Sequence, residues 1–236
     1  MENKRVINQW NSVAKTYASS QCCSQNNLTN YSIINELLGK IKNKNILDAG
    51  CGDGYFSHQL KLAGAKISAC DGSKEFINIA KQTYKEIDFQ VSDLTKKLPH
   101  KNESFDIVVS SLVVMDIEKI EKFFAEAFRT LKHGGKFVFT IMHPCYFIFD
   151  WEKDENGNKL FRKVDNYNQQ TKKILNFCGE TTHYHRTLTW YISRLKKAGF
   201  LIEEFKEFPS NKKAFENMKP HQKRVPLFLG ISCVKI

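Results

Sequence analysis

The sequence predicts an α/β fold with a mainly parallel β-sheet, for three reasons. Short apolar runs alternate along the chain with segments whose apolar residues recur every three or four positions, as strands alternate with helices. Residues 105–109 form an almost unbroken apolar run, which is typical of a strand buried on both faces of a parallel sheet. An earlier apolar run breaks into three alternating glycines, which is the pattern of a strand, a tight loop and a helix.

The chain has 236 residues, of which 42% are hydrophobic, and this is enough for one sizeable core. We therefore expect a single domain over residues 1–236. Two helices are expected within residues 1–42, because Val6, Trp10 and Val13 lie on one apolar stripe and a second stripe begins at Ile34. The polar residues 19–27 between the two stripes predict a loop.

The remaining elements alternate regularly. The expected strands, in order, are residues 46–49, 65–70, 87–91, 105–109, 137–142, 200–208 and 227–236. Ser73 is a candidate cap for the helix that follows the second strand. A helix over residues 120–131 is expected to stop at Gly134 and Gly135, and a basic loop is expected after residue 208.

The glycine loop predicts a nucleoside pocket. Gly50, Gly52 and Gly54 let the backbone turn sharply and approach a ligand, with amide groups of the helix start facing it. Their spacing differs from the Gly-x-Gly-x-x-Gly dinucleotide fingerprint and from the P-loop. Asp48 precedes the loop, and Asp71 lies about twenty residues beyond it, where such folds place an acid that holds two ribose hydroxyls. The alternative is a tight turn without a ligand.

Residues 143–186 lack a regular period and are rich in aromatic side chains. These are Tyr146, Phe147, Phe149, Trp151, Phe161, Tyr167, Phe177 and Tyr184. Asn156-Gly157 is a plausible hairpin turn within the segment. Because it follows a strand that ends at the ligand crevice of an open sheet, we expect the segment to form a lid over a substrate pocket. The alternative is an extra hairpin on the sheet edge.

Composition excludes several classes. No apolar run is long enough for a membrane span or a signal core, so we expect a cytoplasmic protein without a membrane partner. The seven cysteines lie scattered without a Cys-x-x-Cys pair, which indicates reduced thiols and no structural zinc. The oligomeric state stays open.

The net charge of +11 raises the possibility of a nucleic-acid partner. Lysines are nevertheless spread over the whole chain, as on an ordinary solvated surface. The one local cluster consists of Lys212, Lys213, Lys219, Lys223 and Arg224. We favour a solvated surface over a nucleic-acid patch.

Several motifs resemble those of the class I S-adenosylmethionine-dependent methyltransferases, and within them the bacterial small-molecule branch, over essentially the full length. They are Leu47-Asp-Ala-Gly-Cys-Gly-Asp-Gly54, Cys70-Asp-Gly-Ser73, Asp93-Leu94, Phe105-Asp-Ile-Val-Val-Ser-Ser-Leu112, Leu131-Lys-His-Gly-Gly-Lys-Phe137 and, near the start, Trp10-Asn-Ser-Val-Ala-Lys-Thr-Tyr17. The resemblance implies a doubly wound, Rossmann-like sheet of seven strands with the last strand antiparallel. It also implies S-adenosyl-L-methionine as the cofactor and S-adenosyl-L-homocysteine as the product.

The residues that we expect at the cofactor are Tyr17, Asp48, Gly50, Cys51, Gly52, Tyr55, Asp71, Gly72, Ser73, Phe76, Asp93, Leu94 and Ser110. The resemblance implies that Gly50 and Gly52 lie close to the methionine part of the cofactor and that Asp71 binds the ribose hydroxyls. Asp93 accepts from the adenine amino group, and the side chains of Phe76 and Leu94 pack around the ring. The carbonyl of Ser110 receives the methionine amine, while Tyr17 touches its carboxylate.

Methyl transfer from a sulfonium is an in-line displacement that gains most from positioning, and a base is needed only if the acceptor loses a proton. His143 and His185 are the candidate bases, because an imidazole titrates near neutrality. The alternative is that each fixes a loop by hydrogen bonding. His183 with His185 lacks the nearby carboxylates that a metal site needs, so we expect no metal.

Cys145 follows a proline, as the nucleophile of pyrimidine C5-methyltransferases does. The segment Ser110-Ser-Leu-Val113 carries neither the signature of that class nor that of exocyclic base methylation. We therefore expect methyl transfer to an oxygen or nitrogen of a small, aromatic or apolar metabolite. The alternatives are an RNA methyltransferase, a non-catalytic protein that binds the cofactor and, more distantly, an NAD oxidoreductase.

Overall fold

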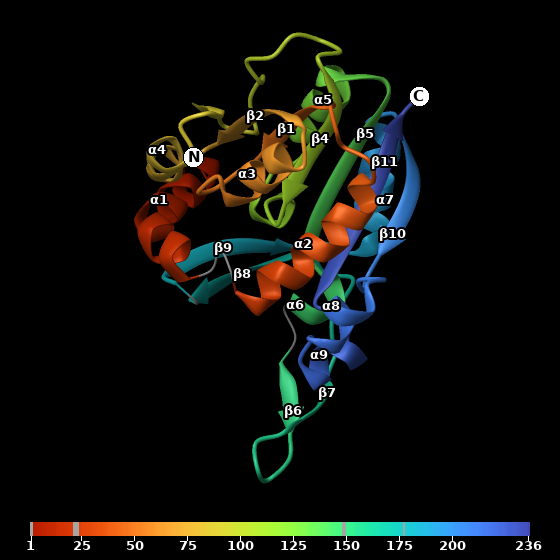
Figure 1. Ribbon diagram of the computed structural model, residues 1–236. Helices are drawn as coiled ribbons and strands as arrows, with labels where there is room; N and C mark the ends of the chain where they lie inside the picture. The colour runs from red at the N-terminus through yellow and green to blue at the C-terminus, as the bar shows by residue number, and fades with distance from the viewer. Residues whose placement is uncertain (1, 21–23, 148–149, 177) are drawn as a thin grey trace.

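The computed structural model describes residues 2–20, 24–147, 150–176 and 178–236. At its centre is a seven-stranded sheet in the spatial order β10-β11-β5-β4-β1-β2-β3 (Figure 1). Its strands are β1 (Asn45–Ala49), β2 (Lys66–Asp71), β3 (Asp88–Val91), β4 (Phe105–Ser111), β5 (Leu131–Met142), β10 (Phe200–Lys206) and β11 (Phe228–Lys235). The strand β11 is antiparallel to both of its neighbours, and the pairings among β1 to β5 are parallel. The predicted fold, including the antiparallel last strand, is confirmed.

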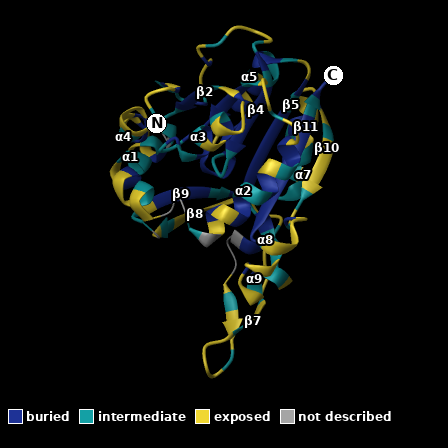
Figure 2. Cartoon of the chain, in the orientation of Figure 1, coloured by how far each residue is buried: buried dark blue, intermediate teal, exposed yellow. Residues whose placement is uncertain are grey.

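Helices cover both faces of the sheet, because its inner strands are apolar on both sides (Figure 2). Ile46 pairs in register with Ile107, and both face α2 (Gln25–Leu38) and α3 (Tyr55–Leu62). Their neighbours Leu47 and Val108 face the opposite layer, which contains α5 (Glu121–Thr130) and α7 (Leu188–Lys197). This two-sided burial accounts for the unbroken apolar run at 105–109.

Two helices border the ligand crevice. The helix α4 (Lys74–Thr83) starts at the predicted cap, where the Ser73 hydroxyl accepts from the Phe76 N–H at 3.2 Å. The first helix, α1 (Glu2–Ser20), packs against α4 and against β9 (Glu180–His185). It therefore lies across the tips of the parallel strands.

Several predicted boundaries were wrong. The strand β5 begins at Leu131, because that residue is extended, pairs with Phe105 and buries its side chain. Gly134, with φ of +71°, lies in a bulge of the strand and does not stop the helix. The loop expected at 19–27 is shorter, since α1 reaches Ser20 and α2 starts at Gln25; residues 21–23 lie outside the described ranges. The strand β10 ends at Lys206. The basic segment after it, expected as a loop, contains the short helices α8 (Lys212–Glu216) and α9 (Pro220–Arg224).

The irregular segment after β5 contains a short helix and two hairpins. It begins with α6 (Pro144–Phe147), then β6 (Trp151–Lys153) pairs with β7 (Lys159–Arg162), and β8 (Thr171–Asn176) pairs with β9. The predicted turn at Asn156-Gly157 is confirmed, with Gly157 at φ of +80°. The β6–β7 hairpin extends away from the sheet, whereas β9 packs on α1 and on the 3-10 turn η1 (Val114–Asp116) (Figure 1). Of the two hairpins, the second lies near the strand tips, and the lid over residues 143–186 stays a prediction.

Some sequence expectations fall partly outside the described ranges. Of the aromatic residues in the segment, Phe149 and Phe177 are not described, and neither are Cys22 and Cys23. The five described cysteines form no disulfide among themselves. None of the helices in the described ranges is long and apolar enough to cross a bilayer.

Candidate cofactor-binding site

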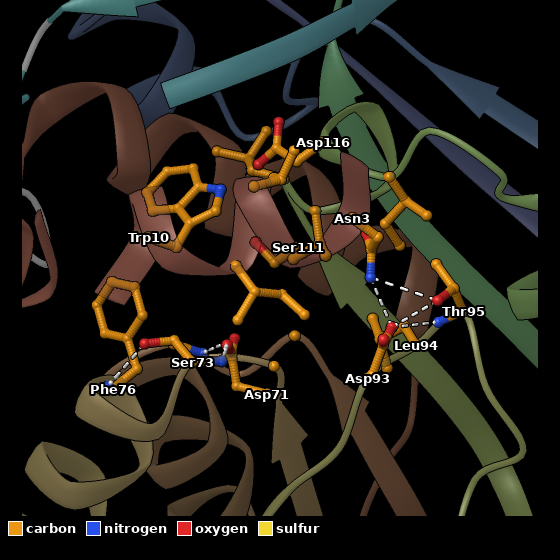
Figure 3. A pocket seen from close by; sticks show the side chains of 18 of the residues that line it. Asn3, Trp10, Asp71, Ser73, Phe76, Asp93, Leu94, Thr95, Ser111 and Asp116 are labelled. Atoms are coloured by element: carbon orange, nitrogen blue, oxygen red, sulfur yellow. Dashed lines mark hydrogen bonds between the residues drawn. The ribbon is translucent and has the colours of Figure 1, made fainter. Parts of the chain in front are cut away.

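A cavity of about 120 Å³ lies at the carboxyl ends of the parallel strands, beneath α1 (Figure 3). The ends of β1, β2, β3 and β4 lead into the loops that form its floor, which is where open α/β sheets bind ligands. From α1 come Asn3, Val6, Ile7, Trp10 and Tyr17, which form the facing wall. The cavity is thus enclosed between the sheet edge and the first helix.

The glycine loop needs glycine for two different reasons. Gly50 has φ of +86°, and a Cβ there would lie 2.4 Å from Cγ2 of Val113. Gly52 has φ of +54°, but a Cβ there would meet no atom within 4 Å, because the residue borders the cavity. The Gly52 N–H donates to Oδ2 of Asp71 at 3.0 Å. The loop is therefore joined directly to the acid at the end of β2.

Asp71 is held with both carboxylate oxygens engaged by backbone. Its Oδ1 accepts from the Ser73 N–H at 2.8 Å, and its Oδ2 accepts from Gly52. Burial raises the pKa of Asp71 to about 6, although these two hydrogen bonds lower it. A carboxylate so fixed at a strand tip presents its remaining lone pairs to the cavity, as a ribose-binding acid does.

A second acid and an aromatic wall border the cavity at opposite ends, since Asp93 lies on one side of Asp71 and Trp10 and Phe76 lie on the other (Figure 3). Oδ1 of Asp93 accepts from Nδ2 of Asn3 at 2.7 Å, so α1 is attached to the acid after β3 (Figure 3). The rings of Trp10, Tyr17 and Phe76 contact one another with centroids 5.7 to 6.2 Å apart. Such a wall suits a flat heteroaromatic group.

A second cavity of about 60 Å³ adjoins the first and shares Tyr17, Gly50, Gly52, Ser111 and Leu112 with it. Two buried oxygens in its wall have no donor within the described residues, Oδ1 of Asp48 and Oδ1 of Asn30. Burial raises the pKa of Asp48 to about 7, although the Ser57 hydroxyl donates to its Oδ2 at 2.5 Å. These oxygens call for a ligand that donates hydrogen bonds.

The electrostatics of the two cavities contrast with those of the whole chain. Their described lining includes Asp48, Asp53, Asp71, Asp93 and Asp116 and contains no lysine or arginine, while the chain has a net charge of +11. An acidic wall without a cation disfavours a phosphate or pyrophosphate and favours a ligand with positive charge. S-adenosylmethionine, with a sulfonium and an ammonium against one carboxylate, has that charge.

The structure also reveals an acid–histidine pair that sequence reasoning missed. Asp116 of η1 lines the main cavity, and its Oδ1 lies 2.5 Å from Nδ1 of His183 on β9. Thr181 contacts the other ring nitrogen of His183 at 2.9 Å, and Trp10 hydrogen-bonds to Asp116. Burial raises the pKa of Asp116, although His183 and Arg186 lower it. The only sequence signal was an acid five residues beyond Ser111, close to a strand tip.

Eleven of the thirteen residues expected at the cofactor line the cavities. Tyr17, Gly50, Gly52, Asp71, Gly72, Ser73, Phe76, Asp93 and Leu94 line the main one, and Asp48 and Cys51 line the second. Tyr55 lines neither and packs on Tyr31, with centroids 5.7 Å apart. Ser110 also lines neither, because its buried hydroxyl donates to the Ala49 carbonyl at 2.8 Å; the next residue, Ser111, lines both. The individual roles stay predictions.

The two candidate bases lie outside the lining of both cavities. Nε2 of His143 lies 2.9 Å from Oε1 of Glu207, and its Nδ1 accepts from the Cys145 N–H. Nε2 of His185 donates to the Tyr167 carbonyl at 2.8 Å. These contacts favour the alternative in which each histidine holds a loop, and catalysis by either stays a prediction. Among the described residues, no three His, Cys, Asp or Glu side chains are placed to hold a metal ion.

The strand order, the glycine loop and the acids at neighbouring strand tips define an α/β enzyme that binds an adenosyl group. Residues 47–139 match the family model described as a methyltransferase domain. The chain is 31% identical, over 78% of its length and 76% of the relative, to a malonyl-[acyl-carrier protein] O-methyltransferase of Buchnera aphidicola. It is 27% identical, over 57% of its length and 65% of the relative, to a ubiquinone biosynthesis O-methyltransferase of Pelagibacter ubique.

A solved S-adenosylmethionine-dependent methyltransferase from Mesorhizobium loti superposes on 89% of the chain and 100% of its own length, with a TM-score of 0.78 and 26% identity. The chain belongs to the class I S-adenosylmethionine-dependent methyltransferases. It is accordingly an enzyme that uses S-adenosyl-L-methionine as its methyl donor.

Proposed function

We propose that the enzyme methylates an oxygen or nitrogen of a small metabolite. The observation that carries this proposal is the enclosure of the cavity by α1. Apolar side chains of Val6, Ile7 and Val113 border the acidic floor, so the acceptor is a compact, partly apolar molecule. Two similar proteins are named as O-methyltransferases, of malonyl-[acyl-carrier protein] and of ubiquinone biosynthesis, which supports methyl transfer to an oxygen.

The cofactor supplies an electrophilic methyl group, and the residues of the chain hold and align the reactants. Asp71 holds the ribose hydroxyls and Asp93 the adenine amino group. The free oxygens of Asp48 and Asn30 lie where they can accept from the ammonium group. Since in-line transfer depends on alignment, a fixed floor and a covering helix provide most of the required positioning.

Asp116 is the group best placed to take a proton from the acceptor. It borders the main cavity, burial raises its pKa, and Nδ1 of His183 lies 2.5 Å from its Oδ1. His143 and His185 stay candidate bases, but Asp116, unlike either of them, lines the main cavity. An acceptor that is already an anion or a free amine would need no such step.

The test is mass-detected methylation of a metabolite library by the purified chain, with Asp71→Ala as the control. A product heavier by one methylene that appears only with the unsubstituted chain supports the proposal. Formation of S-adenosylhomocysteine only when RNA is added would contradict it and support the RNA alternative. Cofactor binding without turnover on either library would favour the non-catalytic alternative.

A further inference from the structure

A group of basic side chains lies on the β6–β7 hairpin and α9, which adjoin each other in Figure 1 at a distance from α1. Trp151 of β6 is at its centre. Lys159 places Nζ 5.5 Å from the centre of the Trp151 ring, and Arg162 places Cζ 4.8 Å from it. The ring of His221 on α9 packs edge-on at 5.3 Å. Two segments about sixty residues apart thus bring their basic groups to one indole.

We call this group, with Lys219 and Arg224, the hairpin–α9 cluster. Its members lie within one another's electrostatic field. The pKa of Lys159 is lowered first by burial and then by Arg162 and Lys219. Burial also lowers the pKa of His221, and Lys159, Lys219, Arg162 and Arg224 lower it further. Such mutual repulsion destabilises the free protein unless an anion is present.

No carboxylate of the described residues lies within 4 Å of these cations. The nearby ion pairs use other side chains, Lys173 with Asp150 and Lys212 with Glu216. Arg162 hydrogen-bonds to Tyr146, and the carboxylate that attracts it, that of Asp150, is almost fully exposed. The cluster therefore has an uncompensated positive charge.

Among the described residues, two buried donors of the cluster also lack an acceptor. Nε1 of Trp151 and Nε of Arg162 are buried and have no acceptor among the described residues. Arg224 uses its guanidinium to donate to the carbonyls of Lys159 and Leu160, at 2.6 and 3.0 Å, which fixes the hairpin to α9. A fixed set of donors that lacks acceptors matches an anion with several oxygens.

We propose that the hairpin–α9 cluster is a binding site for a phosphate group, separate from the cofactor cavity. Lys159, Arg162 and His221 gather around one indole rather than forming a track, which fits a single phosphate group better than the backbone of an RNA. The phosphate can belong to a free ion or to a lipid headgroup. Leu160 and Phe161, exposed beside the cluster at 46% and 57%, suit the second source.

The test uses the full chain and two double variants of equal charge. Lys159→Gln with Lys219→Gln weakens the cluster, and Lys212→Gln with Lys213→Gln on α8 removes the same charge outside it. We expect inorganic phosphate at constant ionic strength to bind the unsubstituted chain and the α8 variant, by calorimetry. The cluster variant should bind at least about tenfold more weakly, since two charge-assisted hydrogen bonds to the anion are lost. It should also unfold at a higher temperature in phosphate-free buffer, because repulsion is relieved.

A second arm distinguishes the sources of the phosphate. Vesicles of phosphatidylglycerol and of phosphatidylcholine at equal ionic strength are mixed with the three proteins and sedimented. Binding to phosphatidylglycerol that only the cluster variant loses assigns the site to a headgroup, and phosphate binding alone assigns it to a free phosphate. Equal effects of the two double variants, or no binding of phosphate or vesicles, overturn the proposal. So does binding of a single-stranded RNA that phosphate cannot displace.

Discussion

Replacing Gly52 by alanine should separate the ligand role of the glycine loop from its backbone role. Gly52 has φ of +54°, and the new Cβ would lie in open space at the cavity wall. Gly134 gives a matched control, because it also has a positive φ, of +71°, and an equally free Cβ direction, but lies in the β5 bulge away from the cavities. The two substitutions therefore impose similar strain in different places.

The left-handed conformation costs an alanine roughly 1–2 kcal/mol. For a domain of this size, each kcal/mol lowers the melting temperature by about 2–4 °C, so both Gly52→Ala and Gly134→Ala should melt about 2–8 °C lower. Only Gly52→Ala adds a methyl group to the space beside the amide that Asp71 engages. Overfilling a packed site costs about 1–3 kcal/mol, which corresponds to a dissociation constant for S-adenosylmethionine about 5- to 150-fold higher.

The assay combines thermal melting with calorimetric titration of S-adenosylmethionine into all three proteins. If Gly52→Ala binds the cofactor as tightly as Gly134→Ala, the cofactor does not pass along this loop and the site has been misplaced. Gly50→Ala extends the series, since its Cβ would lie 2.4 Å from Val113. It should lower the melting temperature more than either of the others.

Three further outcomes are expected. The pKa of Asp71 is about 6 in the free protein, and the ionised form binds the ribose. The affinity for the cofactor should therefore fall up to about tenfold per pH unit below about 6. Calorimetry from about pH 5 to 8 should show that Asp71→Asn lacks this dependence. Burial raises the pKa of Asp48 to about 7, so this residue takes up a proton on folding between about pH 4 and 7. The free energy of unfolding should therefore fall as the pH rises through that range. Denaturant titrations should show that this free energy falls less in Asp48→Asn than in the unsubstituted chain. Asp116→Asn should lower kcat with little change in cofactor affinity and move the acidic limb of the pH profile; an unchanged profile would remove Asp116 as the proton acceptor.

The sequence was sufficient for the features that depend on neighbouring residues. Alternating glycines allow a tight turn after a strand, and acids at strand ends meet because parallel strands finish at one edge, so Gly50 and Asp71 could be placed without coordinates. The pair of Asp116 and His183 could not, because it joins a turn after β4 to a hairpin 67 residues later. The hairpin–α9 cluster was equally inaccessible, since only its α9 side was visible as a run of basic residues.

Local patterns failed where tertiary contacts outweighed them. Gly134 and Gly135 carry the usual signal of a helix end, yet Leu131 already leaves the helix because pairing with Phe105 and burial of its side chain favour an extended backbone. The histidines were chosen as bases by residue type and sequence position alone. Their ring nitrogens contact Glu207 and the Tyr167 carbonyl, and neither contact leaves a mark in the sequence.

The attachment of α1 has a consequence for how fast the enzyme can exchange its cofactor. The helix is held over the strand tips partly by polar contacts, from Asn3 to Asp93 and from Asn11 to Ser73, which water can replace at little cost. We therefore expect the cofactor to enter and leave when this helix moves away from the strand tips, and not through a permanently open entrance. Weakening either attachment should shorten the residence time of bound nucleoside, so the pace of repeated turnover would be set at the chain's first twenty residues.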